Sequence, residues 1–354
     1  MSAAPHEIHT QPCAVCYLCG ARGEILYERL EDRLFGVAGS WNSMRCPNPD
    51  CSLVWLDPMP LEEDIGKLYL TYLTHTTGSV FPQTHFPSFR QKLGNALLAT
   101  AFGYAFHQQP YWLSLLGKLA LRSRLLRERA GSSVSWLQAS WGKRLMDVGC
   151  GNGEFLARMR SLGWDGVGVE PDPQAAQIGR EKYGLSIHSG TLEQAALASE
   201  SFDVVTMAHV IEHLRNPIST LETAKRILRS GGRIIIHTPN LASLGHRWFR
   251  AHWRGLEPPR HLFLFSPQAL QKIAETAGFK VLELKTLFMN SIWQLSCASK
   301  NGCNPRSVPS GYARLRGRLA MLVEHFAGGP PFQLPWGEQL TLIAVKPGLH
   351  ESIG

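Results

Sequence analysis

The chain has 354 residues, 44% of them hydrophobic, which is enough for one large domain with attached parts and a substantial core. It contains no apolar run of the about 18 residues that a membrane-spanning helix needs, and its N-terminus lacks the pattern of a secretion signal. We therefore expect a cytoplasmic protein. The net charge of +8 favours acidic partners, such as nucleic acid, phosphorylated metabolites or an anionic membrane surface, and it equally fits an arginine-rich surface that keeps the protein soluble.

Cysteines are concentrated near the start of the chain, where five of the eight lie within the first 51 residues. In a chain without an export signal, this clustering favours a metal site over a disulfide framework. A CxxC pair and a second pair with four intervening residues can supply four thiolates to one zinc ion. Such a site has no position left for water or substrate, which predicts a structural role. The predicted ligands are Cys16, Cys19, Cys46 and Cys51.

One of these ligands has a competitor. Cys13 and Cys16 also form a CxxC pair, but Gly20 follows Cys19 where a knuckle turn needs a left-handed backbone, which favours Cys16 with Cys19. Segment 20–45 is long enough for a short hairpin between the pairs, as in a zinc ribbon. The alternative to zinc is a set of reduced, buried thiols.

The next part of the chain, residues 59–140, has helical periodicity. We expect a helical lid or linker that covers a ligand pocket, with Tyr69 and Tyr72 as candidates for contact with the substrate. The last helix is rich in arginine, and a basic amphipathic helix can also lie on the inner face of a membrane, so peripheral membrane contact is an alternative to burial. The predicted helices cover residues 61–72, 93–106 and 111–129.

From residue 143 short apolar strands alternate with helices and tight turns. This alternation predicts a Rossmann-like α/β fold, with a doubly wound, mostly parallel sheet, an antiparallel last strand and the ligand at the carboxyl ends of the strands. An insert at about 290–335, with no role that we can assign, separates the last two strands. The predicted strands are 144–148, 166–170, 201–207, 233–237, 278–284 and 339–345, and the predicted helices are 154–162 and 221–228.

The first strand runs into the glycine-rich turn 147–153, and the second strand ends in Glu170. A dinucleotide site has the spacing GxGxxG and receives a pyrophosphate. Here the spacing is GxGxG, with Asp147 two residues before the first glycine. Glycines allow close approach to a methionine moiety, Asp147 can complement its positive end, and Glu170 can accept hydrogen bonds from both ribose hydroxyls. The pattern favours S-adenosylmethionine; the alternative is an ordinary strand–helix turn beside an incidental acid.

These motifs resemble those of class I S-adenosylmethionine-dependent methyltransferases, and more narrowly of the group with an N-terminal cysteine-knuckle module. The resemblance is carried by LCG, RCPNPDCSLVWLDPMP, LMDVGCGNGEF, GVEPDP, SFDVVTMAHVIEHLRNP, LRSGGRIIIHTPN and EPPRHLFLFS, and about residues 75–140 and 290–335 have no match. Many relatives have an aspartate at the adenine edge, where this chain has GTLE, so a backbone contact is expected there. The implied cofactor-binding residues are Asp147, Gly149, Cys150, Gly151, Gly153, Glu170, Pro171, Thr191, Leu192, Ala208 and His209.

Residues near the transferred methyl group are expected after the strand that ends at residue 207. In relatives the loop at His209 passes under the methionine moiety. Glu212 and His213 are expected to begin a helix, where Glu212 has either a capping or a functional role. The sulfonium is already an activated leaving group, so the enzyme chiefly aligns the reactants, and a base is needed only for a poor nucleophile.

The loop 253–262 interrupts the alternation of strands and helices and contains two adjacent prolines. Arg260 could hold an anionic group of the acceptor, and His261 could remove a proton from it. Alternatively, an Arg–carboxylate pair and a satisfied histidine fix this loop to the domain. As candidate bases we rank His261 above His209 and His213.

The organisation that follows is a zinc-binding module (1–58), a helical lid or linker (59–140) and a methyltransferase domain (141–349). Relatives with this layout act on sugars, glycan precursors or secondary metabolites, which implies methyl transfer to an oxygen or carbon of a small molecule, with phosphorylated molecules among the candidates. A nucleic-acid methyltransferase is the main alternative, although acids and bases are balanced between the cysteine pairs and no interleaved aromatic and basic face is present there. The third alternative, a non-catalytic cofactor-binding protein, is disfavoured by the intact glycine turn.

Overall fold

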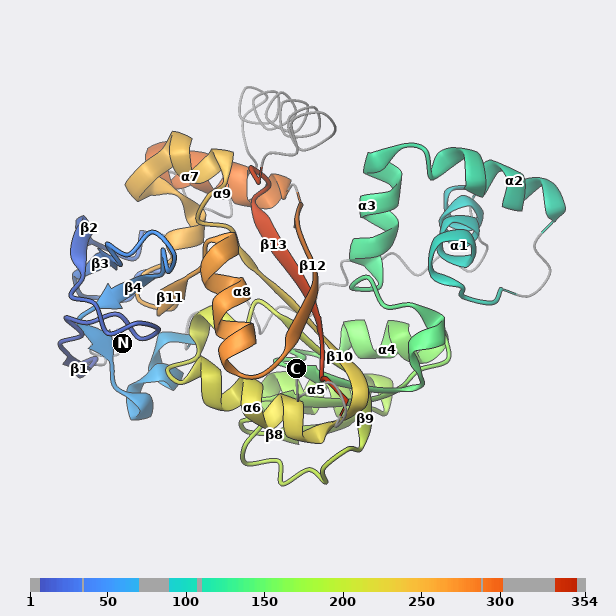
Figure 1. The fold of residues 1–354 in the computed structure, drawn as a ribbon, viewed down its shortest axis with the longest axis horizontal. Helices are drawn as coiled ribbons and strands as arrows, with labels where there is room; N and C mark the ends of the chain where they lie inside the picture. Colours follow the sequence, from blue (N-terminus) through green and yellow to red (C-terminus); the bar gives the residue numbers. More distant parts are fainter. Residues whose placement is uncertain are drawn as a thin grey trace, which may run out of the picture. The chain divides into compact units, whose positions relative to one another are not determined.

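A computed structural model describes residues 7–33, 35–69, 89–106, 110–287, 289–301 and 335–348 (Figure 1). The chain divides into two compact units, each assembled from segments that are far apart in the sequence. The first comprises Met1–Tyr72, Ala208–Glu222 and Ile236–Ala344, and the second comprises Leu73–Met207, Thr223–Ile235 and Val345–Gly354. Within the described ranges, none of the helices has both the length and the apolar character needed to cross a bilayer.

The predicted Rossmann-like sheet is confirmed: it has seven strands in the order β12-β13-β10-β9-β6-β7-β8. Strand β6 pairs in parallel with both β7 and β9, and β7 pairs in parallel with β8. This arrangement brings the carboxyl ends of four strands to one edge, where a ligand is expected. The antiparallel direction of the last strand stays a prediction. The strands are β6 (Arg144–Val148), β7 (Asp165–Glu170), β8 (Ser186–Ser189), β9 (Phe202–Ala208), β10 (Leu228–Pro239), β12 (Lys280–Leu287) and β13 (Gln339–Val345).

The helices of the second unit differ from the prediction at two places. The helix expected over 93–106 is shifted towards the N-terminus and is α1 (Phe89–Phe102). The helix expected over 111–129 is two helices, α2 (Tyr111–Ala120) and α3 (Arg124–Ser133). Helix α2 ends where the N–H groups of Arg122 and Ser123 form i→i+3 hydrogen bonds to the carbonyls of Leu119 and Ala120. The unit also contains η3 (Ala139–Trp141), α4 (Glu154–Ser161), α5 (Pro173–Tyr183) and the end of α6 (Pro217–Ile227).

The first unit contains the cysteine-rich region. Its four-stranded antiparallel sheet has the order β11-β4-β3-β2, and β2 and β3 are the hairpin predicted between the two cysteine pairs. The fourth strand comes from a distant part of the sequence, since Phe263 of β11 pairs with Trp55 of β4. The strands are β2 (Glu24–Leu30), β3 (Trp41–Arg45), β4 (Val54–Asp57) and β11 (Phe263–Leu264), beside a separate pair of β1 (Thr10–Gln11) and β5 (Met59–Pro60).

Short helices complete the first unit. The helix expected over 61–72 is η1 (Glu62–Tyr69), and residues 70–72 lie outside the described residues. The helix expected to begin at Glu212 is a single turn, η4 (Ile211–His213), and the longer helix α6 begins only at Pro217. Of the predicted insert, its first part forms α9, and 302–334 lie outside the described residues. The other helices are α7 (Leu244–Phe249), η5 (Arg250–His252), η6 (Arg254–Leu256), α8 (Pro267–Thr276) and α9 (Asn290–Asn301).

Candidate functional sites

The glycine-rich turn in the second unit connects β6 to α4. Three of its glycines have a left-handed backbone, with φ of 68° at Gly149, 54° at Gly151 and 77° at Gly153. The N–H of Gly149 donates to the carbonyl of Val169 at 2.8 Å, which holds the turn against β7. A Cβ atom built on Gly151 would have no neighbour within 4 Å, so this side of the turn is open. The turn therefore presents bare backbone to a ligand.

Two buried acids lie beside this turn. Asp147 is 4% exposed, and its Oδ1 accepts a hydrogen bond of 2.6 Å from the hydroxyl of Thr206. Glu170 accepts from the N–H of Gly151 at 2.7 Å and from the N–H of Asp172 at 2.9 Å, one bond to each carboxylate oxygen. Burial raises the pKa of Asp147 to about 7 and also raises the pKa of Glu170. Thr206 was not predicted, because its contact depends on the pairing of β9 with β6 rather than on a local signal.

The other predicted cofactor residues of this unit are placed around the same two strands. Cys150 is buried and Pro171 is exposed. The N–H of Gly190 donates to the carbonyl of Glu170 at 3.0 Å, which brings the following turn to the end of β7. In that turn Leu192 is buried and Thr191 is exposed. A contact of this turn with adenine stays a prediction.

The first unit brings together the predicted residues that follow β9. Glu212 is fully buried, its Oε1 lies 3.2 Å from Nδ1 of His209, and its Oε2 accepts from the hydroxyl of Thr238 at 3.0 Å. His209 has a positive φ of 57°, which is unusual for a residue with a side chain, while its N–H donates to the carbonyl of His237. Ala208, which precedes it, is exposed.

All three candidate bases lie beside Glu212, His209 through the contact just described. One ligand atom each of Glu212, His213 and His261 lies within 4.8 Å of the others. His213 Nδ1 lies 2.9 Å from the carbonyl of Arg260 and 2.9 Å from the hydroxyl of Tyr69. Burial lowers the pKa of both His213 and His261, so both rings are neutral near neutral pH. The other predicted substrate tyrosine, Tyr72, lies outside the described residues.

Arg260 occupies a closed environment. It is 1% exposed, and its guanidinium donates to Asp32 at 2.8 Å, to Glu257 at 3.0 Å and to the carbonyl of Leu68 at 3.2 Å. It also lies over the ring of Phe35, 4.6 Å from the centroid. Of the two roles considered for Arg260, this geometry favours the Arg–carboxylate pair that fixes the loop over a contact with an anionic acceptor.

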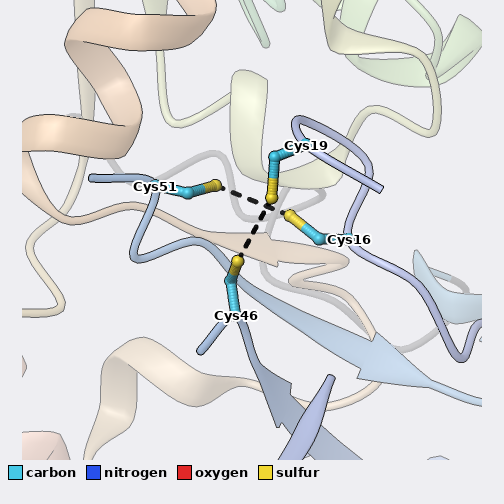
Figure 2. Close-up of side chains that lie close together, drawn as sticks. All are labelled: Cys16, Cys19, Cys46 and Cys51. Atoms are coloured by element: carbon cyan, nitrogen blue, oxygen red, sulfur yellow. Dashed lines mark hydrogen bonds between the residues drawn. The ribbon is translucent and has the colours of Figure 1, made fainter. Parts of the chain in front are cut away.

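The four predicted zinc ligands converge. Their sulfur atoms lie within 4.8 Å of one another, with 3.6 Å between Cys16 and Cys51 and 3.4 Å between Cys19 and Cys46 (Figure 2). Gly20 has a φ of 70°, as predicted for the first knuckle. Cys13 is not part of this group.

Comparisons with known proteins agree with the methyltransferase function that the glycine-rich turn predicts. Residues 104–284 match the model of a family described as a methyltransferase domain. The chain is similar to the ubiquinone biosynthesis O-methyltransferase of Cereibacter sphaeroides, with 31% identity over 172 residues that cover 44% of this chain and 68% of the relative. The corresponding enzyme of a Ruegeria species is 33% identical over 172 residues, covering 45% and 70%.

Among solved structures, an S-adenosylmethionine-dependent methyltransferase from Archaeoglobus fulgidus is similar, with a TM-score of 0.42, 19% identity, and coverage of 67% of this chain and 100% of that one. The matched family region spans about half of the chain and includes the glycine-rich turn, both buried acids and the loop at His209. The chain therefore belongs to the methyltransferase-domain family, and it is an S-adenosylmethionine-dependent methyltransferase.

Proposed function

We propose that the enzyme transfers a methyl group from S-adenosylmethionine to an oxygen of a small-molecule acceptor, with carbon as the second choice of acceptor atom. Binding of the cofactor is supported above all by one observation, the open glycine-rich turn beside two buried acids. The choice of oxygen is supported by the relatives, which are named O-methyltransferases. Sugars, glycan precursors and secondary metabolites are the acceptor classes to be tested.

The residues of the second unit fit this cofactor. A carboxylate can accept about four hydrogen bonds, and the two backbone donors that orient Glu170 leave acceptor capacity for a ribose diol. Asp147 is placed to complement a positive ammonium group, which would stabilise its ionised form. The open side of Gly151 accepts a ligand without a steric clash. When bound, S-adenosylmethionine supplies a methyl group on a positively charged sulfur, and the chain's task is to bind, orient and exclude water.

Calorimetry tests the cofactor site. We expect S-adenosylmethionine to bind the unmodified enzyme and to bind Asp147→Asn and Glu170→Gln at least about tenfold more weakly, since each variant loses a charge-assisted contact. Asp165→Asn is the matched control, because Asp165 lies on β7 but has a side chain that is 69% exposed. Equal affinities for all four proteins would refute the assignment of these two acids.

A panel of acceptors tests the other half of the proposal. Transfer of a radiolabelled methyl group to hydroxylated aromatic compounds, sugar nucleotides and a structured RNA should give product with one of the small-molecule classes. Mass spectrometry then locates the methyl group on oxygen or carbon. Labelling of the RNA alone, in a manner that weakens with salt, would instead support a nucleic-acid methyltransferase.

We further propose that the four clustered cysteines bind a structural zinc ion. In a tetrahedral site with Zn–S distances of about 2.3 Å, the sulfur atoms lie about 3.8 Å apart, and the observed separations of 3.4 and 3.6 Å need little adjustment. Metal analysis should find one zinc per chain, lost in Cys46→Ser and retained in Cys13→Ser. Loss of zinc from the Cys13 variant, or its retention in the Cys46 variant, would contradict this ligand set.

A further inference from the structure

A second group of potential metal ligands lies in the first unit, formed by Glu212, His213 and His261. Glu212 and His213 belong to η4, and His261 lies just before β11. The N–H of Leu262 donates to the carbonyl of Glu212 at 2.8 Å, so the backbone holds the two segments together. The three side chains are thus positioned by the fold and not by their own contacts alone.

The hydrogen bonds of the two histidines fix which ring nitrogen carries the proton. Nδ1 of His213 lies 2.9 Å from the carbonyl of Arg260, and Nδ1 of His261 lies 2.7 Å from the carbonyl of Gly255. A carbonyl oxygen only accepts, so each Nδ1 is the donor where these two bonds form, and the hydroxyl of Tyr69, 2.9 Å from Nδ1 of His213, is then a second acceptor. In a neutral imidazole the other nitrogen, Nε2, then has a free lone pair. Histidines that bind metals typically donate their second ring N–H to a backbone carbonyl in this way.

The third group is an acceptor as well. Glu212 is 0% exposed, and its carboxylate is oriented by the hydroxyl of Thr238 and by the ring of His209. A buried carboxylate beside two imidazole lone pairs is an arrangement of acceptors that a cation would satisfy.

Other charged groups border His261. Its Nε2 lies 3.4 Å from Glu257, and that carboxylate also pairs with Arg254 and Arg260. Because two guanidinium groups already neutralise Glu257, it does not supply the counter-charge that the site needs. A proton on Nε2 is the competing explanation for this contact, and the experiment below distinguishes it from a metal.

We propose that Glu212, His213 and His261 bind a divalent ion of the Mn²⁺ and Fe²⁺ class, at a site separate from the four cysteines. Two imidazoles and one carboxylate suit such ions, in contrast to a thiolate site. Three protein ligands leave coordination positions open on such an ion. An ion there would lower the pKa of a coordinated hydroxyl; this role, unlike the binding itself, rests on the proposed methyl transfer to oxygen.

Mn²⁺ is the probe that separates the two sites, since thiolates prefer softer ions. The enzyme, carrying one equivalent of zinc per chain for the cysteine site and no excess, is titrated with Mn²⁺, and the free ion is measured by electron paramagnetic resonance. We expect one saturable site per chain. Pulsed measurements on the unmodified enzyme should detect couplings to two histidine nitrogens, a signature that a merely structural histidine pair would not give.

Variants complete the test. Glu212→Gln and His261→Asn should each weaken Mn²⁺ binding at least about tenfold, whereas His188→Asn, on the exposed face of β8, should leave it unchanged. If a buried variant unfolds, His213→Asn and the nitrogen couplings of the unmodified enzyme decide the question. The proposal is overturned if Mn²⁺ shows no saturable binding, or binds without histidine couplings.

The outcome is independent of methyl transfer, because Mn²⁺ binding is measured without cofactor or acceptor. Saturable binding with no methylated product would preserve the metal site and reject the proposed acceptor. If the enzyme transfers methyl groups without Mn²⁺ and also shows no saturable Mn²⁺ binding, the metal site is rejected and the methyltransferase proposal is preserved.

Discussion

Replacement of Arg260 provides the sharpest test of how the loop before β11 is held. The guanidinium is buried together with the carboxylates of Asp32 and Glu257, each with a side chain that is 3% exposed. In Arg260→Ala, Asp32 loses this cation, and Glu257 keeps its contacts with Arg254 and with the ring of His261. Removing one partner of a buried ion pair costs about 3–5 kcal/mol, because the remaining charge is desolvated and uncompensated.

The control is an exposed pair of the same unit. Arg45 and Glu24 join β3 to β2 with side chains that are 54% and 56% exposed, so Arg45→Ala should cost at most about 1 kcal/mol. Unfolding in urea measures both variants. Since a chain with two compact units can unfold in more than one step, amide hydrogen exchange over 254–262 should be measured alongside, and its protection should fall only in the Arg260 variant.

A double-mutant cycle with Asp32→Asn and Arg260→Met isolates the pair itself. We expect a coupling energy of about 1–3 kcal/mol, in the range seen for side chains in direct contact. A cost of less than about 1 kcal/mol in Arg260→Ala, combined with a raised KM for the acceptor, would refute this reasoning and return Arg260 to the role of an anion-binding residue.

Three further predictions concern the second unit. Burial raises the pKa of Asp147 to about 7, and a bound ammonium group would lower that pKa again. Binding of S-adenosylmethionine near pH 7 should therefore release a proton, and the affinity should increase as the pH rises towards 7. Calorimetry in buffers of different ionisation enthalpy should show this proton release in the unmodified enzyme and not in Asp147→Asn. Gly151→Ala and Gly163→Ala place a side chain at φ of 54° and 95° in open space, so each should cost about 1 kcal/mol of stability, but only the Gly151 variant should bind the cofactor more weakly in calorimetry. Asp203→Ala removes an acceptor from two backbone N–H groups at 2.9 Å at the start of β6, and should destabilise the protein in urea by about 1–3 kcal/mol without changing its cofactor affinity.

Local patterns predicted the strands and turns around the glycine-rich turn. The bounds of β6 and β13 match the expected strands, because a short apolar run between polar turns has few other structures open to it. Helix α5 was not predicted, although its signals are strong: Asp172 caps its first turn through the N–H of Gln174 at 2.9 Å, and Gly184 ends it with a φ of 61°. Both signals are local, so the sequence alone is sufficient to predict this helix.

Other features depend on contacts that no local pattern contains. Strand β11 has only two residues, too few for periodicity, and it becomes a strand because β4 supplies its hydrogen bonds. One glycine in the sequence favours Cys16 over Cys13, and in the structure the sulfur atom of Cys16 converges with those of Cys19, Cys46 and Cys51. Arg260 and Glu257 look like solvent-exposed charges in a polar loop, and their burial follows from Asp32, which is more than 200 residues away in the sequence.

The contacts of β11 join the cysteine region to the rest of the first unit. A metal-binding module encoded before a catalytic domain suggests an independent attachment, yet the N–H of Leu56 on β4 donates to the carbonyl of Leu262 at 2.9 Å. Leu30 and Val54 share one buried core with Trp253 and other residues of the same unit. Leu262 in turn donates to Glu212, so the backbone connects the cysteine sheet directly to the carboxylate and histidine cluster. A zinc ion that orders the cysteine turns would therefore also order the loop that positions His261, and its removal should disturb Mn²⁺ binding at a site to which the cysteines contribute no ligand.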